Sequence, residues 1–208
     1  MRSIIHEFDE RDREARIFLD HIRDSVNEIG NVNSTPLLKS SFLVFLYNSI
    51  ESISVMLFEY IHYEISKHAY ADLDEKIQLL FLSHHFSEKN WTKNKNKLDD
   101  MMIGSLVFPQ LEEFQNKRKL FSGNIDGMRL NKTLKEYNIR VISAQQREYL
   151  KTIKDKRNKL AHGRENFMEA CRGYVLADLE EMREAVYLVL KEMIDNVDEY
   201  ILNKMYLR

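Results

Sequence analysis

The sequence has little of the residues that break helices or cross-link a chain. Its 208 residues include 2 prolines, 6 glycines and a single cysteine, Cys171. So few prolines and glycines predict long, uninterrupted helices and few tight turns. One cysteine excludes an intramolecular disulfide framework and fits a reducing compartment. Cysteine pairs and HExxH motifs, the usual metal-ligand patterns, are absent, so we expect neither a metal nor another cofactor.

The adjacent histidines do not provide metal-ligand spacing either. His84 and His85 are adjacent, and on a helix their side chains would point about 100° apart. This is poor geometry for holding one ion, so we interpret the two residues as a polar surface pair.

The sequence also lacks a strong charge of one sign and a clean membrane-spanning run. The formal net charge is −2, so binding to RNA or DNA would have to come from a local patch. The N-terminus has no apolar core of signal-peptide type. The most apolar run, residues 40–60, is interrupted by Asn48, Glu51 and several serines, which favours a buried helix over a membrane span. We therefore expect a cytoplasmic protein without a membrane segment.

The sequence does contain many hydrophobic residues, 44% of the total, and they recur with helical periodicity. Apolar spacing predicts helices over residues 3–29, 37–68, 69–84, 143–162 and 176–204. Apolar side chains nearly encircle the second of these helices, which should therefore lie at the centre of the core. The length fits one domain, residues 1–208, and the expected fold class is an all-α helical bundle.

The periodicity weakens between residues 87 and 141. "SEKNWTKNKNKLDD" (87–100) is polar and suggests an exposed connection, and residues 101–121 mix helical and strand-like signals. A short amphipathic helix follows at Met128–Tyr137. We interpret 87–141 as an insertion on the helical scaffold that holds a small irregular or β element.

The segment "KDKRNKLAHGRE" (154–165) differs from this generic scaffold. On a helix, Arg157 falls in the same sector as the apolar Ile153 and Leu160, and a charge there needs a partner or an interface. Asn158 and His162 share another face. His162 lies about 140° from Arg157 around the helix axis. Fraying at Gly163, the long arginine side chain or a second copy of the helix could bring the two together.

These three side chains suit RNA cleavage without a metal. A histidine exchanges protons near neutral pH, an arginine donates charge-assisted hydrogen bonds to a phosphate, and an asparagine can orient either group. The alternative is that Arg157, Asn158 and His162 only cap helix carbonyls and satisfy one another. Four basic residues nearby are candidates for RNA binding, with a solvated helix face as their alternative: Lys151, Lys154, Lys159 and Arg164.

"RNKLAHG" (157–163) resembles the RNxLAHG form of the Arg-x4–6-His signature of the HEPN superfamily, the higher eukaryotes and prokaryotes nucleotide-binding domain. The stretch "LLKSSFLVFLYNSIESISVMLFEYI" (37–61) is similar to the long second helix of a bacterial, defence-associated branch, which carries an LxYNxxE-type pattern. "FSGNIDGMRLNKTLKEYNI" (121–139) resembles the middle region of that branch. Together these segments extend the resemblance over most of the chain.

The resemblance implies a helical bundle that dimerises, so that two Arg…His motifs face each other across a composite cleft. Many members are metal-independent endoribonucleases in toxin–antitoxin or antiphage systems. By residue matching, Arg157 and His162 take the catalytic positions, Asn158 the polar position after the arginine, and Glu51 the acid of the upstream helix. For Glu51 the alternative is a buried, hydrogen-bonded residue that positions the motif helix.

The partners that this resemblance implies are an RNA substrate, a second copy of the chain and an antitoxin or defence-complex subunit. Two other functions stay open. The domain could bind nucleotide or RNA without cleavage, or it could be an accessory subunit of a larger defence complex.

Overall fold

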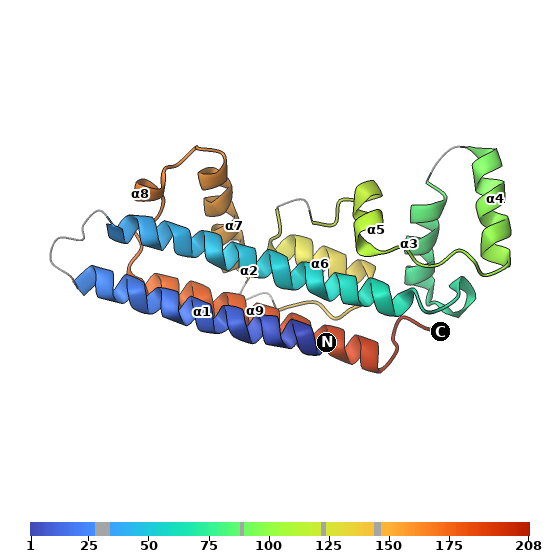
Figure 1. The fold of residues 1–208 in the computed structure, drawn as a ribbon, viewed down its shortest axis with the longest axis horizontal. Helices are drawn as coiled ribbons and strands as arrows, with labels where there is room; N and C mark the ends of the chain where they lie inside the picture. Colours follow the sequence, from blue (N-terminus) through green and yellow to red (C-terminus); the bar gives the residue numbers. More distant parts are fainter. Residues whose placement is uncertain (28–33, 88–89, 122–123, 144–146) are drawn as a thin grey trace.

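Three long helices lie side by side along the length of the computed structural model (Figure 1). They are α1 (Arg2–Asn27), α2 (Ser34–Ile65) and α9 (Leu176–Leu202). The structure describes all residues except 28–33, 88–89, 122–123 and 144–146. The shorter helices are α3 (Glu75–His85), α4 (Trp91–Met102), α5 (Leu111–Lys117), α6 (Gly127–Glu136), α7 (Arg147–Ala161) and α8 (Phe167–Ala170), with a 3-10 turn at Tyr70–Asp72.

Helix α2 is the centre of the bundle. It packs against α1, α7, α8 and α9, and side chains from all round it, including Phe42, Ile50 and Phe58, are fully buried. Within the described residues α2 alone is long and apolar enough to cross a membrane. Its packing accounts for that composition, and the prediction of a buried core helix is confirmed. The helix begins three residues before the expected 37, since Pro36 is tolerated in a first turn, where amides have no helical partner.

The remaining long helices agree with the periodicity, with two gaps. Residues 28–33, between the first two long helices, lie outside the described residues, as does most of the expected start of the motif helix at 143–146. From Arg147 onward that helix is present as α7. The all-α fold class is confirmed.

The middle of the chain differs from its prediction. No strand occurs in the part of the chain that the structure describes, so of the irregular or β element expected there, the β alternative is wrong. The polar stretch that suggested a connection instead forms α4, whose first turn is capped by Asn90: its side chain accepts a hydrogen bond from the amide of Lys93 at 3.1 Å. An asparagine cap followed by lysines, which are good helix formers, explains a helix without a long apolar stripe.

Most of this middle stretch belongs to the core. Phe108, Phe114, Ile125, Leu134 and Tyr137 are fully buried and pack in the same hydrophobic cluster as α2. Within the described part of this stretch, α4 stands away from the bundle (Figure 1). The segment that resembled an insertion therefore supplies part of the surface that α2 needs to bury.

His62 joins α2 to this middle stretch. Its ring is buried, with Nδ1 2.7 Å from the carbonyl oxygen of Pro109 and Nε2 2.7 Å from the hydroxyl of Tyr137. A carbonyl only accepts, so Nδ1 carries the proton and Nε2 accepts from the tyrosine hydroxyl. Burial lowers the pKa of His62 to about 4, which keeps the ring in this neutral tautomer.

His84 is not part of a polar surface pair. It is buried and stacks on Phe114, with 5.6 Å between ring centroids. Burial, helped by the charge of Lys117, lowers its pKa to about 4. At the end of α3, the carbonyls of His84 and His85 accept hydrogen bonds from the ammonium groups of Lys117 (3.1 Å) and Lys97 (2.6 Å). Cations at a helix C-terminus stabilise it, so these lysines fix the end of α3.

The two buried histidines predict a fall in stability in mild acid. In the native state each ring is neutral, whereas in the unfolded chain its pKa is the ordinary value near 6.5. The unfolded state therefore binds more protons than the native state between pH 6.5 and 4. The free energy of unfolding should therefore be fully retained above pH 6.5 and decrease toward pH 4, by roughly 3 kcal/mol for His62. Urea unfolding at a series of pH values measures this slope.

The matched variants are His62→Phe and His84→Phe. Each should reduce the slope between pH 4.5 and 6 by about one proton, whatever its effect on the stability at pH 7. The exposed His21 provides the control, and His21→Gln should leave the slope unchanged. Identical slopes in all four proteins would contradict the assignment.

Candidate functional site

The motif helix α7 packs on α2 and α9 through Leu150, Ile153 and Leu160. Arg157 lies in this sector, as the helical spacing predicted, and is partly buried. Its guanidinium carbon is 4.5 Å from the centroid of the fully buried Tyr47 ring on α2. The face of an aromatic ring attracts a cation, more strongly where water is excluded. The partner that the apolar stripe required is therefore an aromatic face of the core helix.

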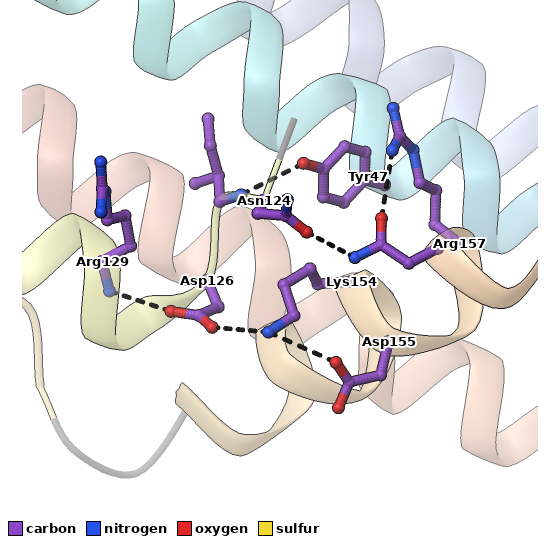
Figure 2. A network of polar contacts seen from close by, with 9 residues as sticks. Tyr47, Asn124, Asp126, Arg129, Lys154, Asp155 and Arg157 are labelled. Carbon is purple, nitrogen blue, oxygen red and sulfur yellow. Dashed lines mark hydrogen bonds and ion pairs between the residues drawn. The ribbon is translucent and has the colours of Figure 1, made fainter. Parts of the chain in front are cut away.

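Asn158 extends this contact to a second segment. Arg157 donates from Nη1 to Oδ1 of Asn158 at 3.1 Å, and Nδ2 of Asn158 donates to Oδ1 of Asn124 at 2.6 Å (Figure 2). The next residue, Ile125, donates its amide to the Tyr47 hydroxyl at 3.1 Å. The segment before α6 thus holds both the amide of Asn158 and the ring beneath Arg157.

Asp126 anchors the same segment to the motif helix. One carboxylate oxygen accepts from the amide of Arg129 at 2.9 Å and caps α6, and the other accepts from Nζ of Lys154 at 2.8 Å (Figure 2). Nζ of Lys154 also lies 3.3 Å from Asp155. Desolvation opposes the charge of Asp126, but Lys154 and the Arg129 amide outweigh it, so the pKa of Asp126 is lowered. The hydrogen bond to Asp126 raises the pKa of Lys154.

His162 lies at the C-terminal cap of α7. The next residue, Gly163, has a φ of 64°. The amide of Gly163 donates to the carbonyl of Leu160 at 3.1 Å, and the amide of Arg164 donates to the carbonyl of Lys159 at 2.8 Å. These two hydrogen bonds form a Schellman motif. The predicted stop at Gly163 is confirmed. The His162 side chain is exposed and makes no hydrogen bond or ion pair with any other described residue. It does not join the network of Arg157 and Asn158.

The expected RNA-binding residues divide into two groups. Lys154 is paired with Asp126, and Lys159 binds Glu165 at 2.6 Å, so their charges are largely neutralised locally. Lys151 and Arg164 are exposed, and their side chains have no such partner among the described residues. A positive field next to the motif would rest mainly on this second pair.

Glu51 lies on α2, one turn after Tyr47, and is half-buried. Burial raises the pKa of Tyr47, and the charge of Glu51 adds to this effect. Glu51 itself makes no hydrogen bond or ion pair within the described residues. The alternative of a buried, hydrogen-bonded glutamate that positions the motif helix is therefore wrong, although Glu51 does lie near the aromatic ring that supports Arg157.

Three residues of the network were not predicted from the sequence as site residues: Tyr47, Asn124 and Asp126. An Asp-Gly pair directly before an amphipathic helix is a capping signal that identifies Asp126 as the start of α6. Tyr47 is buried on the helix that was predicted to be the centre of the core, and its second role depends on where α7 packs. No local pattern pairs Asn124 with Asn158.

The fold and the motif together define a class of protein: a helical bundle with an Arg-x4-His motif that ends a helix packed on the long apolar core helix. Comparison with protein families matches residues 1–206 to the HEPN_MAE_28990-like HEPN family. The chain therefore belongs to this family of HEPN domains, and the resemblance seen in RNKLAHG is confirmed. Membership indicates a ribonuclease-like or nucleotide-binding function. Neither the curated proteins nor the solved structures contain a significant match.

The two functions of Asp126 can be separated by substitution. Asp126→Asn keeps a capping oxygen but loses the charge opposite Lys154, so the free energy of unfolding should fall by about 1 kcal/mol or less. Asp126→Ala also removes the cap and should cost about 1 kcal/mol more. Denaturant unfolding of both variants measures the difference.

Lys154→Met provides the matched change on the other side of the ion pair. Combined with Asp126→Asn, it should destabilise by less than the sum of the two single changes, because both remove the same contact. Strict additivity would show that the pair contributes nothing.

Proposed function

We propose that this protein is a metal-independent endoribonuclease whose active site combines the motif helices of two copies. The observation that carries the proposal is the division of the motif. Arg157 and Asn158 are held in one network against Tyr47, while His162 stands exposed at the end of the same helix. Cleavage of a phosphodiester needs both a proton carrier and a cation at the phosphate. In a dimer, His162 of one motif helix would face Arg157 of the other, so the second helix would complete the site.

The proposed roles follow from the chemistry of each side chain. His162 takes the proton of the ribose 2′-hydroxyl or protonates the leaving oxygen. Arg157 stabilises the charge that develops on the phosphate oxygens, and Asn158 orients Arg157 through the hydrogen bond between their side chains. With the 2′-hydroxyl as nucleophile, the product carries a 2′,3′-cyclic phosphate. Exposed Lys151 and Arg164 would attract the RNA backbone.

The proposed setting is bacterial antiphage defence or a toxin–antitoxin system in the cytoplasm. It rests on the defence-associated branch that the sequence resembles. An antitoxin or a defence-complex subunit would then be the partner that restrains or recruits the domain.

A second candidate is a HEPN domain that binds nucleotide or RNA, or serves as an accessory subunit, without cleavage. The observation that favours it is the pairing of Lys154 and Lys159 with carboxylates. This pairing leaves less free positive charge beside the motif than a strong RNA-binding surface would carry.

Removal of the proton carrier or of the cation should abolish cleavage. Wild type, His162→Ala and Arg157→Ala are incubated with total cellular RNA in excess EDTA, and the cleaved ends are mapped. General acid–base and electrostatic contributions of this kind are each worth roughly 10²–10⁴-fold in rate. His21→Ala, at an exposed histidine of α1, should cleave as wild type does. Cleavage by the two motif variants at the wild-type rate would refute the assignment, and RNA binding without cleavage by wild type would favour the second candidate.

Mixing the two inactive variants tests the composite site. If each site takes Arg157 from one copy and His162 from the other, a mixed dimer contains one intact site. Equal mixtures that exchange freely should then regain about a quarter of the wild-type sites. A site built within one chain would give no recovery.

A further inference from the structure

A groove of about 800 Å³ lies between α3 and α6, away from the motif residues. Its floor and walls include Leu80, exposed Leu79 and exposed Met128. Exposed apolar side chains that line a concave surface are typical of a binding site for an apolar segment. The groove shares none of its lining with the Arg157 network, so it is a separate feature of the molecule.

The rim of the groove is positively charged. Lys132 and Lys135 are exposed on α6, and their ammonium groups have no hydrogen bond or ion pair among the described residues. Arg118 lies 3.2 Å from Glu136, the one carboxylate in the lining, and Lys76 bonds Asn138 at 2.9 Å. The described lining thus holds four cations and one carboxylate, in a chain whose net charge is −2. A fitting ligand would present apolar groups beside carboxylates.

This chemistry favours a protein segment over RNA. Single-stranded RNA is held by cationic grooves in which aromatic side chains stack on the bases. Among the described residues that line this groove, none has an aromatic side chain. Its floor is aliphatic, and aliphatic groups bury the apolar face of a helix well.

The complementary segment occurs at the end of α4. Met102 and Ile103 are 82% and 79% exposed, and the two residues before Met101, Asp99 and Asp100, are exposed carboxylates. Helix α4 lies beside α3 at one end of the molecule, away from the bundle (Figure 1). None of these residues lines the groove of its own chain.

We propose that the α4 tip of one copy, residues 99–103, docks in the α3–α6 groove of a second copy. Met102 and Ile103 would bury against Leu79 and Met128, while the two aspartates meet the lysines of α6. Groove and tip lie on adjoining elements, so two copies can exchange tips reciprocally about a two-fold axis. The contact is smaller than a standard stable interface, and association through it should therefore depend on protein concentration.

A disulfide between two differently tagged proteins tests the contact directly. One carries Ile103→Cys and the other Leu79→Cys, both at exposed positions. Cys171 is buried and does not compete. After mild oxidation with copper phenanthroline, the mixed dimer is measured on a non-reducing gel. Docking should give about tenfold more mixed dimer than the control pair Ile17→Cys with Leu79→Cys, because docking raises the local thiol concentration.

Charge reversal provides the second measurement. Lys132→Glu with Lys135→Glu, placed in the Leu79→Cys protein, should reduce the mixed dimer several-fold. Adding Asp99→Lys and Asp100→Lys to the Ile103→Cys protein should restore it. This readout does not depend on ribonuclease activity or on contacts between motif helices. Cross-linking no higher than the control pair, or unchanged by charge reversal, would overturn the proposal. So would loss of RNA binding on charge reversal without any cross-link, which would identify the groove as an RNA surface.

Discussion

The ring of Tyr47 is the point at which the core of the bundle supports the motif. Its face lies under the guanidinium of Arg157, and its hydroxyl accepts a hydrogen bond from the amide of Ile125. Because the ring is fully buried in the central helix, neither contact can shift without repacking the core. A cation in an apolar sector would otherwise be costly to desolvate. The arginine is therefore held in place by the same packing that stabilises the fold. Its proposed role in electrostatic catalysis would require such preorganisation.

Charge around the motif is distributed unevenly, and carboxylates cause the unevenness. Asp126 forms an ion pair with Lys154, and Glu165 forms ion pairs with both Lys156 and Lys159. These pairs hold the start of α6 and the loop after Gly163 close to α7. The same pairs leave His162 and Arg164 as exposed functional groups at the helix end. The basic residues along α7 therefore make structural contacts, whereas the side chains at its C-terminal end stay exposed.

The sequence predicted what depends on local spacing and missed what depends on distant neighbours. Period 3.6 located the long helices, and Gly163 located the end of α7, because both signals act within a few residues. His84 appeared to be a surface residue because its partner, Phe114, lies 30 positions further on. The motif led to Arg157, Asn158 and His162 as candidates. The bond from Asn158 to Asn124 could not be predicted, because it joins segments that no periodicity relates. Helix α4 was missed because its cap, Asn90, stands in a run that is otherwise merely polar.

The middle stretch is a structural part of the site, and two polar contacts from α2 explain why. Tyr47 and His62 lie about four helical turns apart on α2. The first accepts the amide of Ile125, and the second bonds the carbonyl of Pro109. Both ends of residues 109–125 are thereby fixed to the core helix, and the cap of α6, Asp126, directly follows Ile125. Its N-terminal cap meets Lys154 of the motif helix, while its outer face forms one wall of the α3–α6 groove. One short helix therefore lies between the Arg157 network and the surface proposed for a second copy, so the two sites share a structural support although they share no residue.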